Sequence, residues 1–379
     1  MSLLFGIILG LFILMLLVTL HELGHAVAAR RYGVVVEEFG IGFPPRAIKK
    51  KLKNGTVFSL NWLPLGGFVK LQGENDEANK KGDYGTVTFV QKTKILLAGV
   101  VTNWLIAVIL LSGLALVGLP KILPNQVTIP SDTIIVSQPI EITSIKKGYP
   151  AEKAGLQIGD KIIRFAGQQT PTASRLIEIS KQDKGKKIEV IYDRKGTEHN
   201  VQVELKSNVQ SEYFGAGLGQ RELIKATWSA PVIGAATTVQ YTWLTLQSVG
   251  ELIGSLAKGL ILQINLDQNA RNLASQELKK VSDNVAGPIG ILGTIFPAAQ
   301  QAGLTQIIFL TAIISLTLAV MNILPIPSLD GGTWFTTAFF KLFKKKLTKE
   351  REEKIQTIGF IFLVVLIIMV TIADVTKLF

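Results

Sequence analysis

Four long apolar runs are the first feature of the chain, and they lie at 3–29, 95–119, 304–326 and 355–373. An α-helix needs ~20 residues to cross the hydrocarbon core of a bilayer. The first three runs exceed this length, and the fourth nearly reaches it. Three of the runs contain no ionisable side chain, and the first contains such groups only in a short box near its end. The pattern predicts a polytopic α-helical membrane protein with about four spans.

A polar loop at 30–94 joins the first two runs and is rich in Lys and Arg. Because short loops of this composition stay on the cytoplasmic side, we expect the loop to lie in the cytoplasm. Within it, the segment 56–72 (TVFSLNWLPLGGFVKLQ) alternates apolar and polar side chains on both sides of a Pro-Leu-Gly-Gly turn. This pattern is typical of a β-hairpin, and its apolar content indicates that the hairpin associates with the membrane.

Residues 126–207 have the composition of a water-soluble domain inserted between two spans. Short strand-like pieces alternate with turns, and a helical pattern covers about 172–182. Because the run at 95–119 leads out of the cytoplasm, we expect a mixed α/β domain on the extracytoplasmic side.

The segment 227–262 leaves two interpretations open. It is apolar enough for a span, but Ser, Thr and Gln recur in it, and Glu251 and Lys258 interrupt it. An amphipathic helix at the outer interface fits better than a span, and it keeps the basic loop 341–354 in the cytoplasm. The expected regions are an N-terminal membrane part (1–125), the inserted domain (126–207), a linker with the interfacial helix (208–302) and a C-terminal membrane part (303–379).

Composition agrees with a chain embedded in lipid, since 48% of its 379 residues are hydrophobic and 18% are charged. The formal net charge of +12 is compatible with nucleic-acid binding, but the basic residues flank the apolar runs instead of forming a face interleaved with aromatic residues. We therefore expect a lipid bilayer, and no nucleic acid, as a partner. The absence of cysteine excludes disulfides, thiolate metal ligands and cysteine nucleophiles.

Two of the three histidines lie in the box HELGH, as His21 and His25. Positions i and i+4 share one face of a helix, so both imidazoles can bind a single zinc ion. Glu22 then lies beside the metal, where a carboxylate can accept a proton from the activated water. A chance pentapeptide is the alternative, but ionisable groups inside a membrane cost roughly a few kcal/mol and usually mark a functional site.

A zinc hydrolase needs a third protein ligand and leaves the fourth position to water. The remaining histidine, His199, lies in the soluble region, so we expect a carboxylate from another membrane segment. Asp330 is the only ionisable residue between 304 and 340, and it lies at a depth similar to that of the box if the third run leads inward. The alternative role for Asp330 is a helix cap or a turn before Gly331.

Taken together, these residues resemble the site-2 protease family of intramembrane zinc metalloproteases. Its bacterial members combine H-E-x-x-H in the first span with N-x-x-P-x-x-x-L-D-G in a later one, here residues 21–25 and 322–331. PLGGFVK (64–70) and GPIGI (287–291) resemble further family elements, and GYPAEKAGLQIGDKIIRFAGQ (148–168) resembles a PDZ domain. Some relatives carry two tandem PDZ domains, whereas this chain has one.

The resemblance implies that His21, His25 and Asp330 bind zinc, that Glu22 is the general base, and that Asn322 positions the substrate backbone or stabilises the oxyanion. It implies an intramembrane zinc endopeptidase of a bacterial inner membrane that cuts within or near transmembrane segments of membrane proteins. Anti-sigma factors, in regulated intramembrane proteolysis, and remnant signal peptides are the expected types of substrate.

A transmembrane substrate hides its carbonyls in helical hydrogen bonds, so it must unwind before it is cut. We expect substrates that carry helix-weakening residues near the cut and are first trimmed outside, and we expect the segment 56–72 to hold the unwound stretch as an added strand.

Two other classes of function compete with this interpretation. A catalytically silent scaffold that presents a PDZ module is expected to lack Glu22 or one of the ligands, and none is missing. A transporter that uses buried ionisable groups as an ion path is expected to show inverted repeats, which the sequence does not show. The sequence leaves open whether the PDZ-like groove binds a peptide ligand or the domain acts as a spacer.

Overall fold

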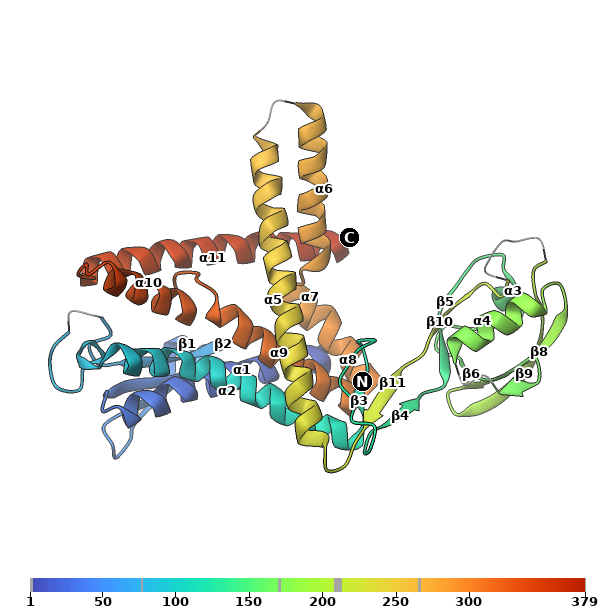
Figure 1. Cartoon of the computed structure of the whole chain (residues 1–379), viewed down its shortest axis with the longest axis horizontal. Coiled ribbons are helices and arrows are strands. Elements are labelled where there is room, and N and C mark those ends of the chain that lie inside the picture. The colour runs from blue at the N-terminus through green and yellow to red at the C-terminus, as the bar shows by residue number, and fades with distance from the viewer. Residues whose placement is uncertain (1–2, 76–77, 170–171, 208–212, 265–266, 379) are drawn as a thin grey trace. The chain divides into compact units, whose positions relative to one another are not determined.

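The computed structural model describes residues 3–378 except 76–77, 170–171, 208–212 and 265–266. Its contacts divide the chain into two compact units (Figure 1). The first comprises Met1–Gly113 and Gly234–Phe379, and the second comprises Leu114–Ile233.

Four helices of the described chain are long and apolar enough to cross a membrane, which confirms the expected number of spans. The ends of these helices differ from the ends of the apolar runs, because capping residues and prolines set where a helix begins or stops. Thr88 and Gln91 cap one start reciprocally, with the Thr88 N–H donating to Gln91 Oε1 at 2.8 Å, and Pro325 prevents continuation of the third helix. These helices are α1 (Leu3–Arg31), α2 (Phe89–Val117), α9 (Leu304–Ile323) and α11 (Lys349–Leu378).

The segment with two interpretations forms one long helix, α5 (Ala230–Gln263), which is not among the four candidate spans. In Figure 1 its axis runs across those of α2 and α11. It contacts α2, where Trp104 Nε1 donates a hydrogen bond to Thr242 Oγ1 of α5 at 3.2 Å. The other helical elements of this unit are η1 (Tyr84–Thr86), α6 (Gln268–Asn284), α7 (Pro288–Gly290), the π-helix η2 (Ile291–Ile295), α8 (Phe296–Ala302) and α10 (Asp330–Leu342).

The loop between α1 and α2 contains two long strands, β1 (Val36–Lys51) and β2 (Val57–Leu71). β2 lies along α1. The predicted β-structure at 56–72 is therefore present, but the predicted pairing was wrong. Glu38 of β1 faces Lys70 on one side and Val57 on the other, so β1 lies between the two arms of the expected hairpin.

The physical reason is that the first half of β1 supplies a packed strand of its own. Residues 36–42 alternate strictly between buried and half-buried side chains, so one face of this segment is packed, and the segment pairs with 57–60 on one edge and with 67–71 on the other. The second half, 46–51, is exposed and pairs with the outer edge of 57–61. Among the described residues, 67–71 therefore forms the edge of this sheet next to α1.

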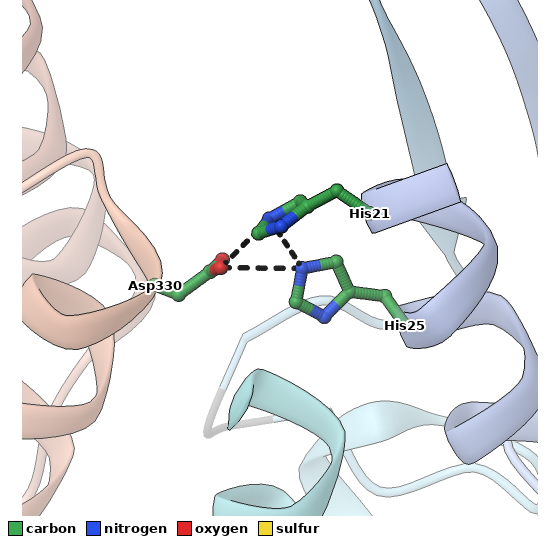
Figure 2. A group of neighbouring side chains, drawn as sticks. All are labelled: His21, His25 and Asp330. Carbon is green, nitrogen blue, oxygen red and sulfur yellow. Dashed lines mark hydrogen bonds and ion pairs between the residues drawn. The ribbon is translucent and has the colours of Figure 1, made fainter. Parts of the chain in front are cut away.

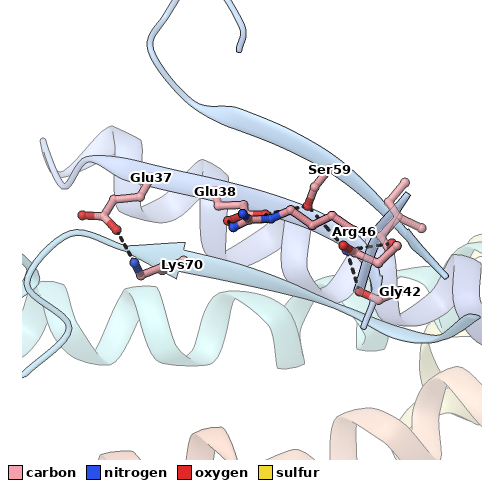
Figure 3. A network of polar contacts seen from close by, with 8 residues as sticks. Glu37, Glu38, Gly42, Arg46, Ser59 and Lys70 are labelled. Carbon is pink, nitrogen blue, oxygen red and sulfur yellow. Dashed lines mark hydrogen bonds and ion pairs between the residues drawn. The ribbon is translucent and has the colours of Figure 1, made fainter. Parts of the chain in front are cut away.

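A buried carboxylate fixes the bend of β1 (Figure 3). Glu38 is buried and accepts hydrogen bonds from Arg46 Nε at 3.0 Å and from Ser59 Oγ at 2.7 Å. Burial alone raises the pKa of a carboxyl group, but the bonds from Arg46 and Ser59 outweigh it and lower the pKa of Glu38. The ion pair therefore ties the second half of β1 to the first.

The second unit is a mixed α/β domain, as expected. Its main sheet has the strand order β10-β5-β6-β8-β9, with β7 on β6, and β3, β11 and β4 form a smaller sheet. Large apolar side chains such as Phe165 and Leu176 are buried in its core. The elements are β3 (Leu119–Pro120), β4 (Ile134–Ser137), β5 (Ile140–Ile145), α3 (Pro150–Lys153), β6 (Lys161–Phe165), β7 (Gln168–Gln169), α4 (Ala173–Gln182), β8 (Lys187–Arg194), β9 (Thr197–Glu204), β10 (Ala216–Gly219) and β11 (Glu222–Lys225).

The expected end of this domain at 207 is too early, because β10 pairs with β5 in the main sheet. The sequence of β10, AGLG, contains no β-branched or aromatic residue and therefore gives no strand signal. Its strand character comes from pairing alone, with Leu218 opposite Ile142.

One buried ion pair anchors the domain. Asp160 is 1% exposed, and it accepts from Arg194 Nε and from the Gln157 N–H, both at 2.7 Å. Burial raises the pKa of a carboxyl group, but the hydrogen bonds from Arg194 and Gln157 outweigh it, so the pKa of Asp160 lies below its usual value.

We predict that Asp160 stabilises this domain near neutral pH and that this contribution is lost in acid. A carboxyl group with a lowered folded-state pKa stabilises the fold above its unfolded value of about 3.9, and this contribution is lost as the pH falls through the folded-state pKa. In the full chain, we expect the temperature at which this domain unfolds to fall below about pH 4. The unfolding is monitored by protease digestion within 114–233. Asp160→Asn should be less stable at pH 7 and lose much of this pH step, whereas Asp183→Asn, at an exposed pair with Lys186, should behave like wild type. Equal acid sensitivity in Asp160→Asn would contradict the assignment.

Candidate active site

Helix α1 places the two histidines of the HELGH box on one buried face. His21 and His25 are 5% and 7% exposed, and their rings meet edge to face with centroids 4.7 Å apart. The two Nε2 atoms lie 3.1 Å from each other. The spacing of four residues therefore produces the convergent pair that the sequence predicts.

Asp330 approaches this pair from a helix that begins some 300 residues later (Figure 2). Its Oδ2 atom is buried and lies 3.0 Å from His21 Nε2 and 3.2 Å from His25 Nε2. The three side chains form the one group of metal-ligand type found among the described residues. The structure thus brings together all three residues that we expect to be ligands.

The loop that precedes Asp330 is held from α11. Gln356 Oε1 accepts from the Ser328 N–H at 2.5 Å, while Gln356 Nε2 donates to Thr333 Oγ1 at 2.9 Å. Ser328 has a φ of 78°, so this turn adopts a backbone that L-residues disfavour. One amide therefore spans the position of Asp330 and fixes the start of α10.

Hydrogen bonding indicates which nitrogen of His25 carries the proton. Its Nδ1 lies 2.8 Å from the carbonyl oxygen of Ile95, which can only accept, so Nδ1 carries the hydrogen. In the neutral ring Nε2 then has a free lone pair, and it points at the carboxylate of Asp330 and at His21. Lone pairs that converge in this way repel one another unless a cation lies between them.

The donor set and its spacing fit zinc. For metal–ligand bonds of about 2.0–2.1 Å, two ligand atoms of a tetrahedron lie about 3.3 Å apart. The observed separations of 3.0, 3.1 and 3.2 Å are close to that value. Two imidazoles with one carboxylate and no thiolate suit zinc, and they leave a fourth position for water.

Glu22 lies on α1 beside the group and faces the edge of the β1–β2 sheet. The backbone N–H of Val69 lies near its carboxylate. A Cβ atom at Gly67 would lie 3.7 Å from Glu22 Cγ, so the strand passes directly over the side chain. The edge strand of the sheet and the candidate general base are therefore in contact.

Helix α2 approaches the histidines at a glycine. A Cβ atom at Gly99 would lie 2.4 Å from His25 Nε2 and 2.6 Å from His21 Nε2. Since real side chains do not tolerate such distances, only glycine leaves this space free. A methyl group here would enter the volume in which the two Nε2 atoms converge.

The two other residues considered from the sequence lie outside this group of three side chains. Asn322 is half-buried in the last turn of α9, and among the described residues its side chain forms no hydrogen bond. His199 lies on β9 in the second unit and stacks on Tyr192 with ring centroids 5.4 Å apart. The structure therefore gives His199 a place in the inserted domain.

Sequence reasoning missed Gly99, Asn103 and Gln356. The available signal was that Asn103 is the only amide in the second apolar run and lies one helical turn after Gly99. Gln356 likewise interrupts the start of the fourth run. Neutral residues of this kind carry no charge that marks them as functional.

Comparison with known proteins agrees with this geometry. The model of a family described as Peptidase family M50 matches residues 9–366. The chain belongs to peptidase family M50.

Full-length relatives support the same assignment. A candidate zinc metalloprotease of Clostridium acetobutylicum is 27% identical over 371 residues, which cover 98% of this chain and 97% of that protein. Zinc metalloprotease RasP of Geobacillus kaustophilus is 25% identical over 443 residues, with 96% of each chain covered. A solved PDZ domain of an SdrC-like protein from Listeria monocytogenes is 19% identical, covers 21% of this chain and 86% of that one, and has a TM-score of 0.20.

Membership of the family confirms the expected class. The chain is an integral membrane protein and a zinc metalloprotease, with zinc as its cofactor and membrane proteins as its substrates. This agrees with the resemblance to site-2 proteases that the motifs indicate.

We predict that Gly99→Ala weakens zinc binding without unfolding the protein. The added methyl would occupy the volume between the two Nε2 atoms, so zinc affinity should fall by at least about tenfold, as measured by chelator competition. Gly113→Ala in the same helix is the matched control, because a Cβ atom there meets nothing within 4 Å. Wild-type zinc affinity in Gly99→Ala would show that α2 does not border the metal.

Proposed function

We propose that His21, His25 and Asp330 hold the zinc ion and that Glu22 is the general base for hydrolysis of peptide bonds within or near transmembrane segments. The observation that carries this proposal is the convergence of three ligand-type atoms within 3.2 Å of one another, next to a glutamate in an apolar helix. Zinc, when bound, supplies a Lewis acid that makes water acidic enough to attack a carbonyl near neutral pH.

The residues of the chain divide the remaining chemistry. The oxygen of the attacking water forms a bond to the scissile carbonyl carbon, and the carboxylate of Glu22 takes a proton from that water. The C–N bond then breaks, and the same carboxyl group can deliver that proton to the amine that leaves.

Asn322 is proposed to position the substrate backbone or to stabilise the oxyanion. Its amide forms no hydrogen bond among the described residues, so its N–H groups are available to a substrate oxygen. An amide donor suits a developing negative charge in an apolar site, where one such donor typically contributes about 10²–10³ in rate.

The sheet edge at 67–71 is proposed to bind the unwound substrate as an added strand. Because 67–71 pairs with β1 along one side only and Gly67 lies next to Glu22, the free edge lies beside the candidate general base. Main-chain bonds to this edge would replace those that a substrate helix loses on unwinding. A substrate strand in this position places its carbonyls next to Glu22.

The finer description of function follows from topology and from the inserted domain. Basic residues in 30–94 and 341–354 favour a cytoplasmic position for these loops, with the inserted domain on the other side of a bacterial inner membrane. Substrates of the anti-sigma-factor or remnant-signal-peptide type, cut within the membrane after outside trimming, fit this arrangement. A peptide ligand is proposed for the cavity of about 880 Å³ between α4 and β10, since β10 is an edge strand.

We predict that two substitutions separate metal binding from catalysis. Asp330→Ala should lose zinc, since two imidazoles alone form an incomplete site. Glu22→Gln should keep zinc but cleave a model membrane substrate about 10²–10⁴-fold more slowly, because the amide cannot accept the proton. Zinc analysis of the purified variants, paired with cleavage assays, tests both. Full zinc occupancy in Asp330→Ala or unchanged cleavage by Glu22→Gln would refute the proposed roles.

We also predict that cleavage depends on the helical stability of the substrate. Replacing two Gly residues near the cut by Ala should stabilise the substrate helix by about 2 kcal/mol and slow cleavage by up to roughly 30-fold. The control places the same substitutions two helical turns away, where they should have little effect. Equal rates for both substrates would indicate that unwinding does not limit the reaction.

A further inference from the structure

Asn103 lies on the face of α2 that meets the histidines. It is 1% exposed, and its Nδ2 atom lies 3.4 Å from His21 Nδ1. Its backbone oxygen accepts a hydrogen bond from Ser315 Oγ of α9 at 2.8 Å, so α2 and α9 are in contact at this turn. An amide is therefore buried directly behind a candidate ligand.

The amide is only partly satisfied. Asn103 Oδ1 is buried and has no hydrogen-bond partner among the described residues. A buried polar atom without a partner costs about 1–3 kcal/mol, so such an atom requires an explanation. The two ends of an amide have the same shape, and rotation by 180° exchanges them and leaves one end unpaired in either case. The count of hydrogen bonds therefore does not choose between the two orientations, and the chemistry of His21 must.

Metal binding selects the orientation. If Nε2 of His21 offers its lone pair to zinc, Nδ1 carries the hydrogen and needs an acceptor. For His25 that acceptor is the carbonyl oxygen of Ile95. For His21 the group within reach is the Asn103 amide, whose oxygen can accept.

We propose that Asn103 is a positioning residue for zinc, and that its Oδ1 accepts the Nδ1–H of His21 and thereby fixes the ring and the tautomer of that ligand. The inference rests on the proposed zinc site. A neutral acceptor suits a position that is fully buried in an apolar helix, because a carboxylate there would be costly to desolvate. The two histidines are then oriented by two different acceptors on α2, eight residues apart.

The test compares Asn103→Leu with Asn103→Asp in the full-length protein. Leu keeps the branched shape but cannot accept a hydrogen bond, so zinc affinity measured by chelator competition should fall about 10–100-fold, the usual effect of losing such a partner. Asp presents an oxygen in the same place; its desolvation lowers the stability of the fold, but the folded protein should bind zinc to within about threefold of wild type. The visible spectrum of the cobalt-loaded protein should be perturbed in the Leu variant and recover in the Asp variant.

Ser315→Ala is the matched control, because it removes the bond to the Asn103 backbone and leaves the side chain unchanged. It should keep wild-type zinc affinity and the wild-type cobalt spectrum. Equal losses in Ser315→Ala and Asn103→Leu would reduce Asn103 to a packing role and overturn the inference. So would wild-type zinc affinity in Asn103→Leu.

Asp330→Ala separates the two proposals. If it loses zinc while Asn103→Leu binds zinc normally, the proposed ligands stand and the role of Asn103 is refuted. If Asp330→Ala retains zinc, the proposed site itself fails, and the inference about Asn103 fails with it.

Discussion

The structure depends on the compensation of polar groups that apolar helices bury. His21, His25 and Asp330 present lone pairs and a carboxylate to one another at about 3 Å, and both imidazoles are buried. Such an arrangement is unfavourable unless a cation joins the three atoms. The cost that makes these residues rare in membrane spans is thus what makes their convergence informative.

Close helix packing is the second requirement, and it determines the residues around the site. Helix α2 reaches the imidazoles only because Gly99 has no side chain, and α10 folds onto its own turn at Gly332, where a Cβ atom would lie 1.9 Å from the Ile326 carbonyl oxygen. Amides complete the arrangement, with Gln356 holding the turn before Asp330. Small residues provide the space, and neutral polar residues provide the orientation.

The sequence predicts the charged part of the site well and the neutral part poorly. His21, Glu22, His25 and Asp330 stand out because charge is rare in the apolar runs, and the structure brings the histidines and Asp330 together. Asn103 and Gly99 are ordinary residues of an apolar helix until the contact with His21 is known. The spans follow from hydropathy.

The sheets of both units were less predictable, because strand pairing is set by contacts between segments and not by local pattern. β1 separates the two arms of the expected hairpin, and β10 has no strand-forming residue of its own. In both cases the partner strand determines the pairing. Phe39 faces Phe58 and Val69 in the first sheet, and Leu218 faces Ile142 in the second.

The close approach of Gly67 to Glu22 joins the sheet to the candidate general base. A helical substrate in an apolar medium loses hydrogen bonds on unwinding, each worth about 4–6 kcal/mol before any replacement, so an exposed carbonyl is costly without a new partner. The edge strand 67–71 has backbone groups that can pair with an unwound substrate, and it lies beside the carboxylate of Glu22. The proposed cleavage within a membrane would therefore require an extended binding edge beside the catalytic group, and among the described residues 67–71 is a sheet edge that lies next to α1.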